Sequence, residues 1–89
     1  MTRIEKARAK FYRLQRENME LKRYIQALET DYNIITDQYM NGDFYVNSNI
    51  GSIQRRYNRA IASNQRKLYK NEKEMRRLQC IIGEILNKI

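Results

Sequence analysis

The chain has 89 residues, with 18 Lys and Arg against 10 Asp and Glu, and a formal net charge of +8. It contains no Pro, no His and a single Cys. The absence of Pro favours long uninterrupted helices, and the length suits one small domain over residues 1–89. Without His or paired Cys, the commonest metal and nucleophile chemistries lack their residues. We therefore predict no enzyme, no metal, no cofactor and no small-molecule substrate.

The first predicted helix runs from about residue 3 to about residue 40. Within it, a set of residues that are all apolar or aromatic except for one Asn recurs in steps of three and four, which places the set on one face of a helix. This first ladder is Ile4, Ala7, Phe11, Leu14, Asn18, Leu21, Ile25, Leu28, Tyr32, Ile35 and Tyr39.

Residues 41–48 are predicted to form a turn. Gly42 can adopt the left-handed conformation that closes a helix. Ser48 or Asn49 can accept a hydrogen bond from the free N–H groups of the next helix. Between them, Phe44-Tyr45-Val46 forms a short apolar tip.

The second predicted helix runs from about residue 49 to about residue 88 and carries a similar ladder. Its residues are Ile50, Ile53, Tyr57, Ile61, Asn64, Leu68, Asn71, Met75, Leu78, Ile82, Ile85 and Ile89. If the chain folds back at the turn, residues whose numbers sum to 89 lie opposite each other, such as Phe11 with Leu78 and Tyr32 with Tyr57. The shared register predicts an all-α fold, an antiparallel two-helix coiled-coil hairpin.

Asn18 and Asn71 also sum to 89, so they are predicted to meet across the hairpin. A buried amide without a partner costs about 1–3 kcal/mol, whereas two facing amides can satisfy each other. Polar pairs of this kind set register in coiled coils. We interpret the two asparagines as a register pair.

More apolar surface remains than one partner helix can cover. Tyr12 and Met19 lie on a second stripe of the first helix, and the end of the second helix is apolar nearly all round at Ile81, Ile85, Leu86 and Ile89. A helix that is apolar all round is normally buried, and small chains bury little surface alone. We expect these residues to bind a partner, completing a four-helix bundle by dimerisation or by docking to another protein's helices.

Charge is unevenly placed along the chain. Residues 24–49 carry no bases and four acids, whereas residues 50–89 carry ten bases and three acids. At 100° per residue, six bases fall on the face of the second helix opposite its ladder. This basic stripe consists of Arg55, Arg59, Arg66, Lys70, Lys73 and Arg77. Three interpretations stay open: a solvated face, a contact for an acidic protein surface, or phosphate contacts to nucleic acid.

Other candidate sites have weaker support. Glu17 and Glu20 lie one turn apart but have no His nearby, and Cys80 is interpreted as a packed or incidental thiol. No apolar stretch of about 18 residues exists, so we predict no membrane span. No apolar signal-peptide core follows the charged N-terminus, so we predict a cytoplasmic protein, with signal-independent secretion left open.

In outline the hairpin is similar to small helical partners and substrates of bacterial secretion systems, and to phage-encoded inhibitors. Type VII secretion hairpins carry a Trp-x-Gly turn and a downstream Tyr-x-x-x-Asp/Glu motif. This chain has no Trp, and Tyr69 is followed four residues later by Lys73. The resemblance is one of architecture alone.

Together these features predict a non-enzymatic protein–protein interaction module, such as an accessory subunit, adaptor, targeting chaperone or inhibitor. It would bind by helix-on-helix packing, with the basic stripe orienting the partner. The alternative is a basic helical dimer that binds nucleic acid through phosphate contacts from the second helix.

Overall fold

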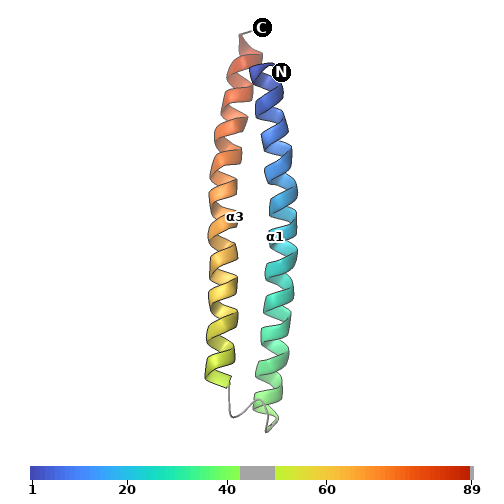
Figure 1. Ribbon diagram of the computed structural model, residues 1–89, viewed down its shortest axis with the longest axis vertical. Coiled ribbons are helices and arrows are strands. Elements are labelled where there is room, and N and C mark those ends of the chain that lie inside the picture. The colour runs from blue at the N-terminus through green and yellow to red at the C-terminus, as the bar shows by residue number, and fades with distance from the viewer. Residues whose placement is uncertain (43–49, 89) are drawn as a thin grey trace.

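The computed structural model describes residues 1–42 and 50–88, which form two helices packed side by side (Figure 1). Helix α1 spans Arg3–Met40 and helix α3 spans Ile50–Asn87. The first turns of α1 and the last turns of α3 lie together at one end of the rod, and the last turns of α1 and the first turns of α3 lie at the other (Figure 1). The rod measures 66 × 18 × 15 Å. The predicted all-helical hairpin is confirmed.

Local chemistry accounts for both limits of α1. Thr2 is the N-cap: its hydroxyl oxygen accepts a hydrogen bond from the Glu5 backbone N–H at 3.2 Å, which satisfies one of the free donors of the first turn. At the other end, Gly42 has a φ of +80°, the left-handed conformation that the sequence predicts for it. The predicted apolar tip at 44–46 and the predicted cap at 48 or 49 lie outside the described residues.

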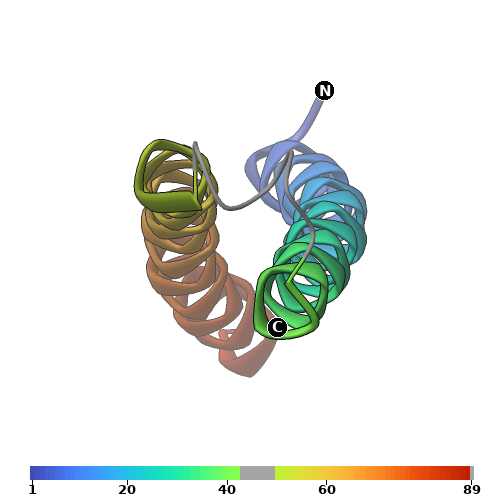
Figure 2. The same ribbon diagram turned by 90° about the horizontal axis from the view of Figure 1, so that it is seen from below.

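The contacts between the helices follow the predicted register. The rings of Tyr32 and Tyr57 lie 6.4 Å apart, edge to face. Ala7, Leu14 and Leu78 form a buried cluster against which Phe11 packs. Seen from the end, the helices wind gradually about each other rather than running as straight parallel rods (Figure 2). Such winding keeps a repeating apolar face turned toward the partner helix.

The core is thin. The buried apolar residues are Ala7, Leu14, Ile25 and Leu78, and no described side chain has less than 2% of its surface exposed. Most other ladder positions are only half-buried, including Leu21, Leu28, Ile53, Ile61 and Leu68. Each helix covers the ladder of the other helix from one side only. The other side of this seam, the contact between the two ladders, therefore stays open to solvent.

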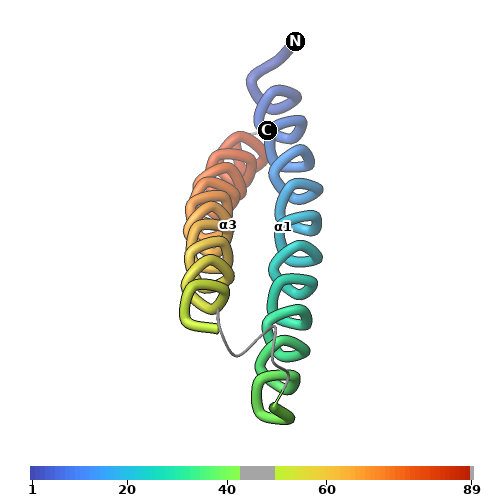
Figure 3. The backbone as a smooth tube through the Cα atoms, turned by 60° about the horizontal axis from the view of Figure 1, so that its bottom comes forward, coloured from blue at the N-terminus to red at the C-terminus, as the bar shows by residue number. Residues whose placement is uncertain are grey.

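At the turn end, α1 continues past the first residues of α3 (Figures 1 and 3). Tyr39 is 41% exposed and Met40 is 76% exposed. The prediction that Tyr39, the last residue of the first ladder, packs against the second helix is therefore wrong. Its counterpart in the register is Ile50, the first residue of α3, so little of that helix is present to cover the ring.

Candidate interaction surfaces

The basic stripe lies on α3, and all six of its residues are exposed. They come from one continuous helix of 38 residues, so their spacing along the rod is set by the helical rise. Arg55 donates a hydrogen bond from Nε to the Gly51 carbonyl at 3.1 Å, which holds its guanidinium close to the helix surface. The helix thus presents a row of cations along one face.

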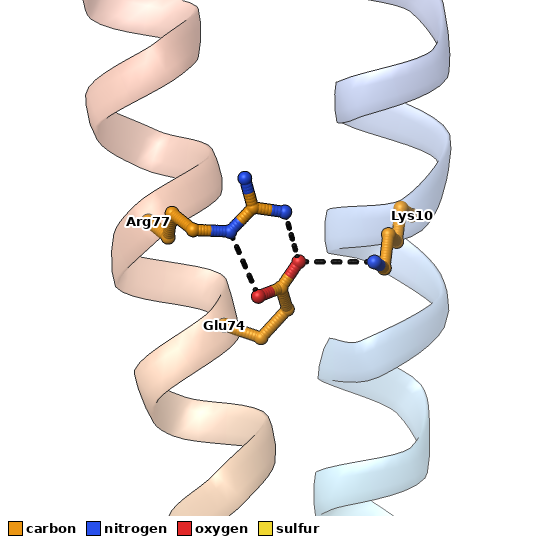
Figure 4. Close-up of polar contacts among 3 residues, drawn as sticks. All are labelled: Lys10, Glu74 and Arg77. Carbon is orange, nitrogen blue, oxygen red and sulfur yellow. Dashed lines mark hydrogen bonds and ion pairs between the residues drawn. The ribbon is translucent and has the colours of Figure 1, made fainter.

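One member of the stripe is neutralised. Glu74 accepts a hydrogen bond from Arg77 Nε at 2.9 Å and also pairs with the Arg77 Nη2 atom (Figure 4). From the opposite helix, Lys10 Nζ reaches the same carboxylate at 2.9 Å (Figure 4). The hydrogen bonds from Arg77 and Lys10 lower the pKa of Glu74 from 4.5 to about 2, and the pKa of Arg77 is raised by the same contact. Arg77 is therefore paired within α3 instead of presenting a free charge, and the contact of Lys10 with Glu74 is the one that joins the two helices.

Sequence reasoning missed the bridging role of Lys10 and Glu74. The pairing of Glu74 with Arg77 is an ordinary contact between residues three apart on a helix, and could have been expected. The contact of Glu74 with Lys10 could not have been expected, because the numbers of these two residues sum to 84, whereas residues opposite each other in the register sum to 89. A long lysine side chain reaches about one turn along the opposite helix, and the ladder register does not show such reach.

Beside the stripe, Tyr69 forms a shallow hollow with its neighbours on α3. The hollow is lined by Ala62, Gln65, Arg66, Tyr69, Lys70 and Lys73. Tyr69 is 55% exposed, and Lys73 Nζ lies 4.7 Å from the centroid of its ring, a cation–π arrangement.

The predicted apolar docking residues fall into two groups. Tyr12 is 59% exposed, Met19 52% and Leu86 46%, so these three are available on the surface. Ile81 and Ile85 are half-buried, and Ile81 packs against the buried cluster of the hairpin itself. Ile89 lies outside the described residues. Sequence reasoning missed two further exposed apolar residues, Tyr24 at 54% and Ile34 at 50%, which lie outside both stripes.

The predicted hydrogen-bonded pair of Asn18 and Asn71 is not formed. Asn18 is 6% exposed, and its Nδ2 donates to the Met75 sulfur at 3.3 Å. Asn71 instead donates to the Glu17 carboxylate at 3.2 Å. The Asn18 Oδ1 atom is buried and has no hydrogen-bond partner within the described residues. Asn18 thus contacts a residue four positions from Asn71, and Asn71 contacts a residue one position from Asn18, because side-chain direction, and not only ladder position, decides which groups meet.

Within residues 1–42 and 50–88, no group of three His, Cys, Asp or Glu side chains is arranged to hold a metal ion. Cys80 is a free, exposed cysteine, so of the two interpretations the packed thiol is wrong and the incidental thiol remains. Neither described helix has a segment both long and apolar enough to cross a lipid bilayer.

Comparisons with known proteins give no relative. No protein family matches the chain, and neither a curated protein nor a solved structure is detectably similar to it.

Proposed function

We propose that the chain is a non-enzymatic interaction module that completes its hydrophobic core against further helices. The observation that carries this proposal is the incomplete core: four apolar side chains are buried, and none of the described ones is fully enclosed. A compact monomer of 10.9 kDa would expose about 5,600 Å². This elongated chain exposes 7029 Å² in total, and its exposed surface includes large apolar side chains, such as Tyr12, Met19 and Leu86, that a partner can cover.

A second copy of the chain is the simplest partner. The half-buried seam residues, such as Leu28 and Ile61, are positions that a second hairpin covers in a four-helix bundle. The exposed residues Tyr12, Met19 and Leu86 add apolar area outside the seam. Accessory subunits, adaptors, targeting chaperones and inhibitors that bind by helix packing all use such surfaces, and the basic stripe would orient an acidic partner by electrostatic attraction.

Sedimentation of the full chain over a wide concentration range tests this proposal. We expect a dimer or larger assembly, and we expect Met19→Asp combined with Leu86→Asp to shift the equilibrium toward monomer by at least tenfold in dissociation constant. Tyr69→Ser is the matched control, because Tyr69 is 55% exposed but belongs to the basic face. A well-folded monomer at the highest concentration would overturn the proposal.

A further inference from the structure

The outer face of α3 holds positive charge that no acidic side chain of the described residues neutralises. Residues 50–71 contain six bases and no acid. The ion pairs formed within residues 1–42 and 50–88 involve only Lys10, Glu74 and Arg77. Arg59, Arg66, Lys70 and Lys73 therefore keep their charge toward solvent. Steps of seven residues, as from Arg59 to Arg66 and on to Lys73, place cations about 10 Å apart along the rod.

Tyr69 gives this face a second kind of contact. The ring is more than half exposed and lies in a hollow with Arg66, Lys70 and Lys73. Lys73 covers one side of the ring at 4.7 Å from its centroid. An aromatic ring among cations can stack on a nucleobase while the cations contact the flanking phosphates. In a single strand every nucleotide supplies both a phosphate for the cations and a base for the ring, whereas the acidic side chains of a protein surface supply the charge alone.

We propose that the outer face of α3 binds single-stranded nucleic acid, with one base stacked on Tyr69 and adjacent phosphates contacted by Arg66, Lys70 and Lys73. A single strand fits better than a duplex because a base must be unpaired to stack on a side chain. This inference does not rest on self-association: the docking residue Met19 lies on α1 and the docking residue Leu86 lies in the last turn of α3, whereas Tyr69 and its cations lie in the middle of α3.

The test measures binding of the full chain to a fluorescent thymidine 15-mer, a duplex of the same length, and polyglutamate, at two salt concentrations. We expect the 15-mer to bind more tightly than the duplex. Tyr69→Ala should weaken single-strand binding roughly 5- to 140-fold, the equivalent of one lost stacked base. Tyr24→Ala is the matched control, because Tyr24 is 54% exposed and lies on α1. It should leave the affinity unchanged.

The charge contribution is tested separately. Arg66→Gln combined with Lys70→Gln should reduce the slope of log affinity against log salt by about 1.4, the value for two lost phosphate contacts on a single strand. Tyr69→Ala should leave that slope unchanged, because the ring carries no charge. Circular dichroism confirms that each variant is folded.

Three results would overturn this proposal. The first is no binding of the 15-mer at low salt. The second is equal binding of duplex and single strand with no effect of Tyr69→Ala, which would indicate phosphate contacts alone. The third is tighter binding to polyglutamate than to the 15-mer, which would indicate an acidic protein partner. None of these depends on the oligomeric state measured by sedimentation, so the two proposals can fail independently.

Discussion

The two ends of the hairpin are packed very differently. Four of the five described residues that are buried lie in the half near the chain ends, namely Ala7, Leu14, Asn18 and Leu78, and the fifth, Ile25, lies just past the middle of α1. The contacts of Lys10 with Glu74, of Asn18 with Met75 and of Asn71 with Glu17 join the helices there as well. In the half near the turn, Tyr32 and Tyr57 meet edge to face, and Ile34 is 50% exposed.

The difference teaches that register and tight packing are separate properties. The ladders continue through both halves, yet only one half has a buried cluster. Small Ala7 allows the helices to approach closely, and Ile81 and Ile82 cover the cluster from the side. The turn half has no such cover. There α1 carries Glu29, Asp31 and Asp37 while α3 carries Arg55, Arg56 and Arg59, and these form no ion pair in the described part of the chain.

The largest expected effect comes from truncating a side chain of the buried cluster. Leu78 is 3% exposed, and Leu78→Ala should lower the free energy of unfolding by about 2–5 kcal/mol. Ile53 occupies a ladder position in the turn half but is only half-buried, so Ile53→Ala should cost about 1–2 kcal/mol. Urea denaturation followed by circular dichroism, at one fixed protein concentration, measures both. Equal losses would show that the two halves are equally packed.

A smaller effect, of opposite sign, is expected at Asn18. Its buried Oδ1 atom has no hydrogen-bond partner among the described residues, so Asn18→Leu should raise the free energy of unfolding by about 1 kcal/mol. If Asn18 also selects register, the variant should form additional oligomeric species in sedimentation. Asn71→Leu is the control, since Asn71 is only half-buried. An Asn18→Leu variant with unchanged melting and oligomeric state would contradict both roles.

The smallest expected effect is the pH dependence of the Lys10–Glu74–Arg77 contact. The pKa of Glu74 is lowered from 4.5 to about 2 by its hydrogen bonds, so the folded state favours the ionised form. Its contribution to stability is therefore fully present above about pH 4.5 and is lost as the pH falls toward about 2.

Melting temperatures of the natural chain and of Glu74→Gln, measured from pH 7 downward, test this dependence. The difference between the two proteins should be constant at neutral pH and should disappear near pH 2. Glu84→Gln serves as the control, because Glu84 is exposed and forms no ion pair with another described residue. A difference that persists at the lowest pH would mean that Glu74 acts through packing and not through charge.

The hairpin could be predicted from sequence because apolar periodicity and the shared register both depend on the positions of residues along a helix. The pairing of Tyr32 with Tyr57 and the left-handed Gly42 follow from the same reasoning. The exposure of the basic stripe also follows, since it lies opposite the ladder of α3.

What sequence alone could not decide is which polar groups meet and how deeply each ladder residue is buried. Asn18 contacts Met75 and not Asn71, and Arg77 is held by Glu74 and so leaves the set of free cations. Both outcomes depend on side-chain direction and reach, which vary within a single helical turn while the ladder spacing stays the same. Sequence periodicity determined that this protein folds as a two-helix hairpin, and it determined the register of the two helices. The tertiary structure decided the depth of its packing and which charged and aromatic groups remain available for binding.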